Sequence, residues 1–342
     1  MVGLRVLSVA WECPDEPYGG LGVFLSRFLP EVARDFDVVH YCLHGASPPL
    51  KPRDFRGARV IRLHEPPIDR GGGVLNLANA VLGGALLPVI PAFDVLLAHD
   101  AHSSTAVVVA GEVGVRAGYY VHMFTQSPTD IAAVAYADVV MANSRLTVSQ
   151  IRDSVARDVR VVYPASPYPP ASEPVRNDNE VPVVAIPSRF QFNKSPVHVV
   201  RALEKVRGRV RFRVVVFGRG AEYYSLPPWV ENAGTVSEEV KVKLIKSSDL
   251  VLQVGFPEPF GLVPLEAVAL GVPALVSRVS GAAEVFPEEA TYTPEDLPEK
   301  LMQLLGDRSV REGLWFRERE SPIMRRSWRD VWAEVREAVG IG

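Results

Sequence analysis

Short apolar runs alternate along the chain with segments whose apolar residues recur at helical spacing. Leu25, Phe28 and Val32, for example, fall on one face of a helix. Strands and helices that alternate in this way predict an open parallel β-sheet with helices on both faces. In the first part of the chain, the apolar runs predict strands at Leu4–Ala10, Asp37–Cys42, Arg59–Leu63, Val95–Ala98, Tyr119–Met123, Val139–Ala142 and Arg160–Tyr163.

A proline-rich segment then interrupts the alternation. Between Pro164 and Glu180 the chain holds five prolines and the polar run Asn177–Asn179, a composition typical of a linker between domains. Further strands are predicted after it, at Pro182–Ile186, Phe212–Phe217, Leu250–Val254 and Ala274–Ser277, with helices at Val197–Val206, Val240–Lys246, Leu262–Leu270 and Pro298–Leu305. The sequence therefore predicts two Rossmann-like open-sheet domains, 1–165 and 181–322, joined by a linker at 166–180. Facing sheets of this kind bind a ligand in the cleft between them, at the carboxyl ends of their strands.

Two apolar segments need a partner surface. The last segment, 323–342, predicts a helix that Ser327 caps and whose apolar stripe docks, back across the linker, on another part of the chain. The uncharged stretch Gly71–Phe93 is long enough to span a bilayer, but its glycines, asparagines and prolines favour a helix leading into a strand. We expect a cytoplasmic protein, and the sequence leaves open a peripheral membrane contact or a homodimer at this apolar face.

Composition excludes several classes of protein. The chain has 342 residues, 47% of them hydrophobic and 23% charged, which is typical of a globular protein and not of a disordered one. Its formal net charge of −3 does not favour nucleic acid as a partner. The two cysteines, Cys13 and Cys42, are too few for a disulfide scaffold or a zinc site and fit an ordinary reduced protein.

The most specific local motif lies after the predicted strand Leu250–Val254. It runs from Phe256 to Glu266 and carries two carboxylates, Glu258 on the loop and Glu266 in the following helix. Backbone N–H groups near Gly261 and Leu262 form an anion site between them. Charged acceptors hold sugar hydroxyls well, so the motif favours a nucleotide sugar. Taken singly, Glu266 is better interpreted as a solvated helix residue and Glu258 as a carboxylate that stabilises the helix start, and only the whole motif favours the nucleotide sugar.

A second motif follows the first strand of the second domain. Arg189 and Lys194 are two cations on one loop, able to neutralise a departing diphosphate. Two exposed surface cations are the alternative interpretation. The presence of Glu258 and Glu266 in the same domain favours the interpretation of these cations as a diphosphate-binding site.

Glycines and histidines add weaker candidates. The loop around Gly20 and the turn at Gly218 each follow a strand, where glycine lets backbone approach a ligand, but neither has dinucleotide-fold or P-loop spacing. His99 with Asp100, and His122, end predicted strands of the first domain on the side that faces the cleft. The pattern contains no metal-ligand spacing; Asp35 and Asp37 are interpreted as a solvated turn.

Together these motifs resemble the retaining GT-B glycosyltransferases of the family 4 type and are similar to glycogen and starch synthases. The resemblance implies that the second domain grips a nucleoside diphosphate sugar and the first presents the acceptor. It further implies that Arg189 and Lys194 bind the diphosphate, Glu258 the donor sugar and Glu266 the ribose, while His122 contacts the reacting sugar and Gly20 lies near the phosphates. Ser188 and Ser195 depart from the family pattern, where glycines are usual.

The sequence thus predicts a glycosyltransferase that moves a hexose, with glucose expected, from a nucleoside diphosphate sugar to a hydroxyl acceptor, with retention and without metal or another cofactor. A mannosyl- or other hexosyltransferase acting on a lipid-linked or small-molecule acceptor, a GT-B nucleotide-sugar epimerase and a non-catalytic binding protein are the alternatives. The candidate residues are, for catalysis, Glu258, Arg189, Lys194 and His122; for donor binding, Glu266, Gly261, Leu262, Gly20 and Gly218; and on the acceptor side, His99 and Asp100.

Overall fold

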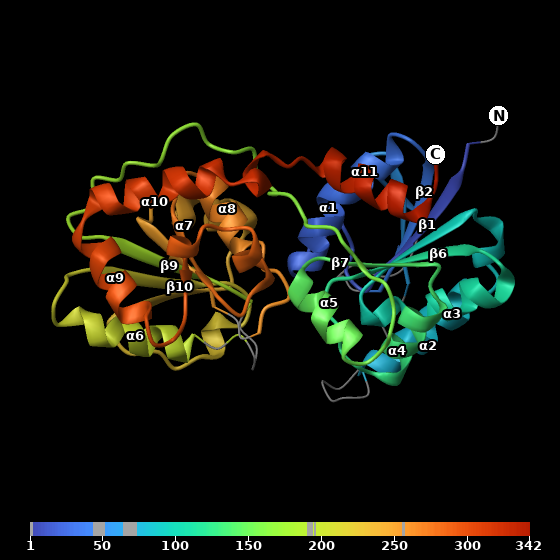
Figure 1. The fold of residues 1–342 in the computed structure, drawn as a ribbon, viewed down its shortest axis with the longest axis horizontal. Coiled ribbons are helices and arrows are strands. Elements are labelled where there is room, and N and C mark those ends of the chain that lie inside the picture. The colour runs from blue at the N-terminus through green and yellow to red at the C-terminus, as the bar shows by residue number, and fades with distance from the viewer. Residues whose placement is uncertain (1–2, 44–51, 64–73, 190–193, 195, 255–256) are drawn as a thin grey trace. The chain divides into compact units, whose positions relative to one another are not determined.

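The computed structural model describes residues 3–43, 52–63, 74–189, 194, 196–254 and 257–342. The chain divides into two compact units (Figure 1). The first comprises Met1–Pro164 with Ser327–Gly342, and the second comprises Ala165–Arg326. Each unit is a parallel-sheet α/β domain, as the sequence predicts.

The first unit is built on an eight-stranded sheet in the order β3-β4-β2-β1-β5-β6-β7-β8. The described neighbours pair in parallel except β3 with β4, which are antiparallel. Apolar residues on the central strands, such as Leu7, Leu96 and Tyr119, are fully buried. The strands are β1 (Arg5–Val9), β2 (Asp37–Cys42), β3 (Arg53–Phe55), β4 (Ala58–Arg62), β5 (Val95–His99), β6 (Arg116–Val121), β7 (Val139–Ala142) and β8 (Arg160–Val161).

Helices cover this sheet: α1 (Gly20–Ala33), α2 (Val74–Leu86), α3 (Ser104–Val113), α4 (Pro128–Tyr136), α5 (Arg145–Arg152) and α11 (Trp328–Val339). The short helix η1 (Ile90–Ala92) follows α2. Gly71–Gly73, the start of the uncharged stretch, lie outside the described residues. Among the described helices, none is long and apolar enough to span a membrane.

The last helix, α11, packs on α1 within the first unit (Figure 1). Ser327 and Asp330 form a capping box at its start, as the sequence pattern of a capped helix predicts. The carboxylate of Asp35, just after α1, accepts hydrogen bonds from Arg329 Nη2 at 2.9 Å and Trp332 Nε1 at 2.8 Å. The interpretation of Asp35 as a solvated turn residue is therefore wrong, because α11 approaches from the far end of the chain and covers it.

The two cysteines also differ from expectation. Cys13, in the loop after β1, and Cys42, the last residue of β2, form a disulfide across a sequence separation of 29. β1 and β2 are neighbouring parallel strands, so the pairing of the sheet brings the two thiols together. The expectation of two ordinary reduced cysteines is wrong, because a count of cysteines carries no information about which strands are adjacent.

The second unit is a six-stranded parallel sheet in the order β11-β10-β9-β12-β13-β14. Its strands are β9 (Val183–Pro187), β10 (Arg213–Phe217), β11 (Val230–Gly234), β12 (Leu250–Leu252), β13 (Ala274–Ser277) and β14 (Thr291–Tyr292). Its helices are α6 (Val197–Arg207), α7 (Glu238–Lys246), α8 (Val263–Ala269), α9 (Leu297–Gly306) and α10 (Arg308–Glu320). Strands and helices alternate along the chain, as predicted.

The proline-rich segment that precedes β9 lies along the second unit. Ala171 N donates to Ala269 O and Val175 N donates to Gly271 O, each at 2.8 Å. Gly271 has a φ of +91°, and a Cβ there would lie 3.0 Å from Val175 N, so glycine permits this close approach. These two backbone hydrogen bonds tie the segment to the end of α8, the helix that carries Glu266, and to the turn just after it.

Candidate functional site

The strand order of the second unit positions its candidate residues. β9 pairs in parallel with β10 on one side and with β12 on the other. Successive strands are therefore added to one side of β9 up to β11 and to its other side from β12 onward, so the strand order reverses between β9 and β12. Loops that leave the carboxyl ends of such strands meet at one edge of the sheet, which is where α/β proteins bind ligands. Arg189 and Lys194 follow β9, and Glu258 follows β12.

The structure brings Lys194 and Glu258 into direct contact. Lys194 Nζ lies 2.6 Å from Glu258 Oε2, and the side chains are only 20% and 10% exposed. Arg189 is half-buried, two residues past the end of β9. Residues 190–193, Ser195 and Phe256 lie outside the described residues. The two motifs, which are separate in the sequence, are therefore adjacent in the structure. The interpretation of Arg189 and Lys194 as two fully exposed surface cations is excluded, because both side chains are partly buried.

Backbone hydrogen bonds fix the loop that carries Glu258. Glu258 N donates to Val279 O at 3.1 Å, and Gly281 N donates to Glu258 O at 3.0 Å. The buried side chain of Gln253 donates through Nε2 to Ser280 Oγ at 3.1 Å, and that hydroxyl donates to Phe260 O at 2.6 Å. Backbone and side-chain hydrogen bonds thus hold the part of the loop from which Glu258 extends.

Two glycines of the prediction permit close approaches between loops. Gly261 has a φ of +84°, and a Cβ there would lie 2.1 Å from Gln253 Nε2. Gly218 has a φ of +127°, and a Cβ there would lie 1.9 Å from Ser188 O. Any other residue would displace the loops that carry Glu258 and Arg189. These glycines shape the site through the backbone.

Glu266 lies on α8 and is buried, so the structure does not support its interpretation as a solvated helix residue. Its Oε1 accepts a hydrogen bond from Lys241 Nζ, on α7, at 3.1 Å. Leu262 is the N-cap residue of α8. Sequence reasoning missed Lys241, because no local pattern links α7 to a glutamate 25 residues further along.

In the first unit, His99 and His122 lie at the carboxyl ends of the paired strands β5 and β6. His99 Nδ1 is 3.4 Å from His122 Nε2. His99 is buried and His122 is half-buried. Burial lowers the pKa of His122 to about 3, and burial is also the main cause that lowers the pKa of His99 well below its ordinary value. Both imidazoles are therefore neutral at neutral pH and available as hydrogen-bonding groups.

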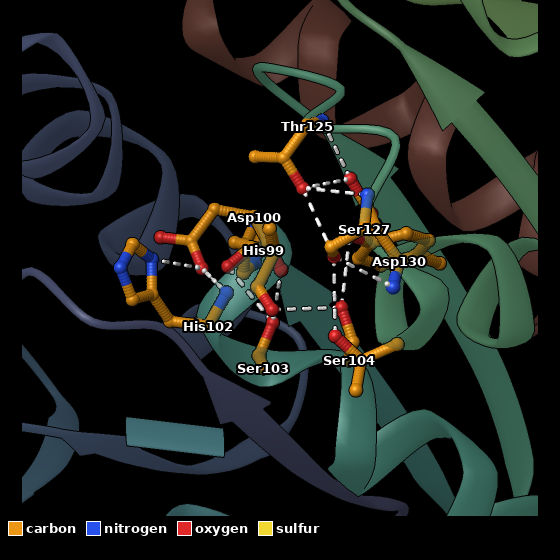
Figure 2. A network of polar contacts seen from close by, with 11 residues as sticks. His99, Asp100, His102, Ser103, Ser104, Thr125, Ser127 and Asp130 are labelled. Atoms are coloured by element: carbon orange, nitrogen blue, oxygen red, sulfur yellow. Dashed lines mark hydrogen bonds and ion pairs between the residues drawn. The ribbon is translucent and has the colours of Figure 1, made fainter. Parts of the chain in front are cut away.

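Asp100 is held in a strained backbone conformation, with a φ of +73°. Its Oδ1 accepts a hydrogen bond from His102 N at 2.8 Å and lies 3.5 Å from His102 Nδ1 (Figure 2). Burial opposes protonation of His102, but the carboxylate of Asp100 outweighs it and raises the pKa of that imidazole. Asp100 and His102 thus form a close pair in the loop that directly follows His99.

A buried carboxylate fixes the neighbouring loop, which follows His122. Asp130 Oδ2 accepts hydrogen bonds from Thr125 N at 2.7 Å and Thr125 Oγ1 at 3.0 Å (Figure 2). Its Oδ1 accepts one from the hydroxyl of Tyr119, on β6. Asn143 Nδ2 donates to His122 O at 2.9 Å. Asn143 thus holds the backbone at His122, and Asp130 holds the loop that follows it at Thr125.

The glycine loop before α1 is organised by a residue that sequence reasoning missed. Glu12 Oε2 accepts hydrogen bonds from Gly19 N at 2.6 Å, Gly22 N at 2.7 Å and Tyr18 N at 3.2 Å. A Cβ at Gly22 would lie 2.7 Å from that oxygen, whereas a Cβ at Gly20 would meet nothing within 4 Å. Gly20, the first residue of α1, thus has open space beside its Cα, whereas the amides of its neighbours Tyr18, Gly19 and Gly22 are bound by Glu12.

The second unit is similar in sequence to known proteins. Residues 170–315 match the family of glycosyl transferases group 1. N-acetyl-alpha-D-glucosaminyl L-malate synthase of Bacillus anthracis is 31% identical over 147 residues, which cover 39% of each chain. Alpha-maltose-1-phosphate synthase of Mycolicibacterium smegmatis is 26% identical over 345 residues, covering 84% of this chain and 83% of that protein. Over the matching segments, the chain spans about two fifths of the length of the first curated relatives.

Solved structures extend the likeness in fold to both units. Sucrose-phosphate synthase from Thermosynechococcus elongatus has a TM-score of 0.77 and 16% identity, covering 98% of each chain. Anabaena HepE, solved in complex with UDP and glucose, has a TM-score of 0.72 and 17% identity, covering 98% of this chain and 99% of that one. The fold is therefore that of the GT-B glycosyltransferases. By sequence, residues 170–315 are similar to the glycosyl transferases of group 1.

Proposed function

We propose that the protein transfers a hexose from a nucleoside diphosphate sugar to a hydroxyl acceptor, with retention of anomeric configuration and without a metal ion. The contact between Lys194 and Glu258 carries this proposal. A cation for the diphosphate and a carboxylate for the sugar hydroxyls are adjacent, as they must be to hold the two parts of one donor. The similarity of residues 170–315 to the group 1 family supports the same reaction class.

The chemistry follows from where charge develops. As the bond between sugar and diphosphate breaks, the bridging oxygen becomes more negative and the sugar gains oxocarbenium character. Lys194 and Arg189 would stabilise that oxygen more strongly in the transition state than in the bound donor. Two fixed cations can supply the positive charge that a metal ion provides in other diphosphate sites. Glu258 would orient the donor sugar through its hydroxyls, because a carboxylate accepts hydrogen bonds strongly.

The remaining candidates take the roles that the family resemblance implies. Glu266 would accept the ribose hydroxyls, and Gly20 would let the backbone lie near the phosphates. A neutral His122 would contact the reacting sugar without repelling its developing positive charge. His99 and Asp100, which end the neighbouring strand, would serve the acceptor.

The donor and acceptor are proposed by analogy. HepE was solved with UDP and glucose, and the other structural neighbour is named for a sugar phosphate product, so UDP-glucose is the first donor to test. The curated relatives are named for malate and maltose phosphate products. A small hydroxyl acceptor with an acidic group is therefore our first choice.

The test is a reaction with a panel of donors. The purified protein is incubated with UDP-glucose, ADP-glucose or GDP-mannose and a panel of sugar phosphates and hydroxy acids. We expect nucleoside diphosphate release that depends on both donor and acceptor, an unchanged rate in EDTA, and an α-linked product by NMR. A β-linked product would contradict retention. Loss of the reaction in EDTA and its recovery with manganese would contradict metal independence. Donor conversion without any acceptor would indicate an epimerase instead.

A further inference from the structure

Glu266 belongs to a cluster of charged and phenolic side chains that the proposed reaction leaves unexplained. Lys241 Nζ lies 3.1 Å from Glu266 Oε1 and 3.0 Å from Glu238 Oε2. The hydroxyl of Tyr168 donates to the other carboxylate oxygen of Glu238, Oε1. The ring of Tyr168 lies under the ammonium group, with 5.7 Å between Nζ and the ring centroid. One lysine on α7 is thus held from three directions.

The exposures within the cluster are unequal. The side chain of Glu266 is 5% exposed and that of Lys241 is 18% exposed, whereas that of Glu238 is 61% exposed. Burial by itself lowers the pKa of Lys241, but the carboxylates of Glu266 and Glu238 and the phenol of Tyr168 raise it above its ordinary value. Lys241 therefore stays charged beside Glu266. A buried pair of this kind costs desolvation energy and adds little net stability, so its value lies in fixing geometry.

The contact with Lys241 restricts how Glu266 can bind a ligand. The carboxylate of a glutamate rotates in a broad torsional well, so an unpaired Glu266 would present its oxygens in many orientations. The hydrogen bond to Oε1 fixes that rotation and hence the direction of the second oxygen, Oε2. A carboxylate with one oxygen fixed can accept from a ribose hydroxyl at a defined position, which strengthens that hydrogen bond.

We propose that Lys241 is a positioning residue that fixes the Glu266 carboxylate for the donor ribose and so sets the preference for ribonucleotides over 2′-deoxyribonucleotides. This inference rests on the proposed function, because it takes Glu266 to be the ribose-binding residue. Tyr168 and Glu238 act through Lys241 by holding its ammonium group. A merely structural ion pair would leave the preference between the two sugars unchanged.

The experiment measures binding of UDP, ADP and GDP, and of their 2′-deoxy forms, by calorimetry. For the wild type we expect the ribose form of the preferred base to bind roughly 10- to 100-fold more tightly, the range for one hydrogen bond to a charged group. In Lys241→Met that ratio should fall by about fivefold or more, whereas Lys241→Arg should retain most of it. Lys243→Met, on the same helix but in an exposed pair with Glu239, should leave the ratio unchanged.

The outcomes separate the two proposals. If the wild type prefers ribose and Lys241→Met keeps the full ratio, the positioning role is overturned while the proposed function stands. If the wild type binds no nucleoside diphosphate, both are overturned. Should Lys241→Met fail to fold, Tyr168→Phe replaces it: loss of the bond to Glu238 should lower the ratio by a smaller factor, and an unchanged ratio would overturn the role of the cluster.

Discussion

Lys194 Nζ lies 2.6 Å from Glu258 Oε2 in the second unit, and both side chains are largely buried. The two residues come from the loops after β9 and β12, which are neighbours in the sheet although far apart in sequence. The pair is therefore a consequence of the strand order. Its proximity links the candidate diphosphate site to the candidate sugar site, and several expectations follow from that link.

Lys194→Ala should lower turnover far more than it weakens donor binding. The ammonium group interacts most strongly with the leaving diphosphate at the transition state, and loss of one such donor costs about 3 kcal/mol, roughly a hundredfold in rate. Arg189→Ala should act alike, and Arg189→Lys should not restore full turnover, since the bidentate guanidinium is lost. Steady-state rates at saturating donor measure this effect. Lys243→Ala, in an exposed ion pair, is the matched control and should be near normal; equal rates for Lys194→Ala and this control would refute the role of the cation.

Substitution of Glu258 by glutamine and substitution of Glu266 by glutamine should affect different kinetic parameters. Glu258→Gln should depress kcat, because the donor sugar loses its orienting carboxylate near the reacting bond. Glu266→Gln should chiefly raise KM for the donor and weaken binding of free nucleoside diphosphate. Glu239→Gln, exposed on α7, is the control. Free nucleoside diphosphate that binds Glu266→Gln as tightly as the wild type would show that the ribose lies elsewhere.

The stability of the second unit should fall as pH rises, through Glu318. This carboxyl is fully buried against Ala274 N, and burial raises its pKa well above the ordinary value. A raised folded-state pKa means that its contribution is fully present below the unfolded pKa, about 4.5, and is lost as pH rises toward the folded pKa. Glu318→Gln, which keeps the acceptor, should raise Tm at pH 8 and change it little near pH 4. Thermal unfolding across this range, with exposed Glu320→Gln as control, checks the sign; a uniform shift would contradict it.

Removing the link between Cys13 and Cys42 should destabilise the first unit. A cross-link with a sequence separation of 29 restricts the unfolded chain, and loop-closure entropy sets an upper estimate of about 3–4 kcal/mol. The double variant Cys13→Ser/Cys42→Ser should therefore unfold at lower temperature, and reductant should lower the Tm of the wild type but not of the variant. Thiol titration in denaturant provides a direct check, since two reactive thiols in protein purified without reductant would contradict the disulfide.

Elements with strong apolar patterns were predictable from the sequence. β7 and β13 have the predicted bounds, and α11 begins at its predicted cap Ser327, because buried strands and a capped amphipathic helix leave local signals. β11, an edge strand with exposed Glu231 and Asn232, has no such signal and was missed. The charged helix α10 was missed for the same reason.

The candidate site likewise contains residues that local sequence motifs indicate and residues that only the tertiary structure shows. Glu258, Glu266 and Lys194 stand in local motifs, so the sequence indicates them, and the sheet brings two of them together. Lys241 and Glu12 contribute through contacts between elements that are separate in the sequence. Periodicity and spacing in the sequence describe one element at a time. Contacts between separate elements can be predicted only when the strand order and the helix packing are known.

The most direct test of the account is a crystal structure of the protein with a nucleoside diphosphate bound. We expect phosphate oxygens within hydrogen-bonding distance of Lys194 Nζ and the Arg189 guanidinium, and ribose hydroxyls at the carboxylate of Glu266. The space beside Glu258, on the far side of the diphosphate from the ribose, should then be left for the donor sugar. A nucleotide bound away from these residues, with the Lys194–Glu258 and Lys241–Glu266 pairs both undisturbed, would contradict the account.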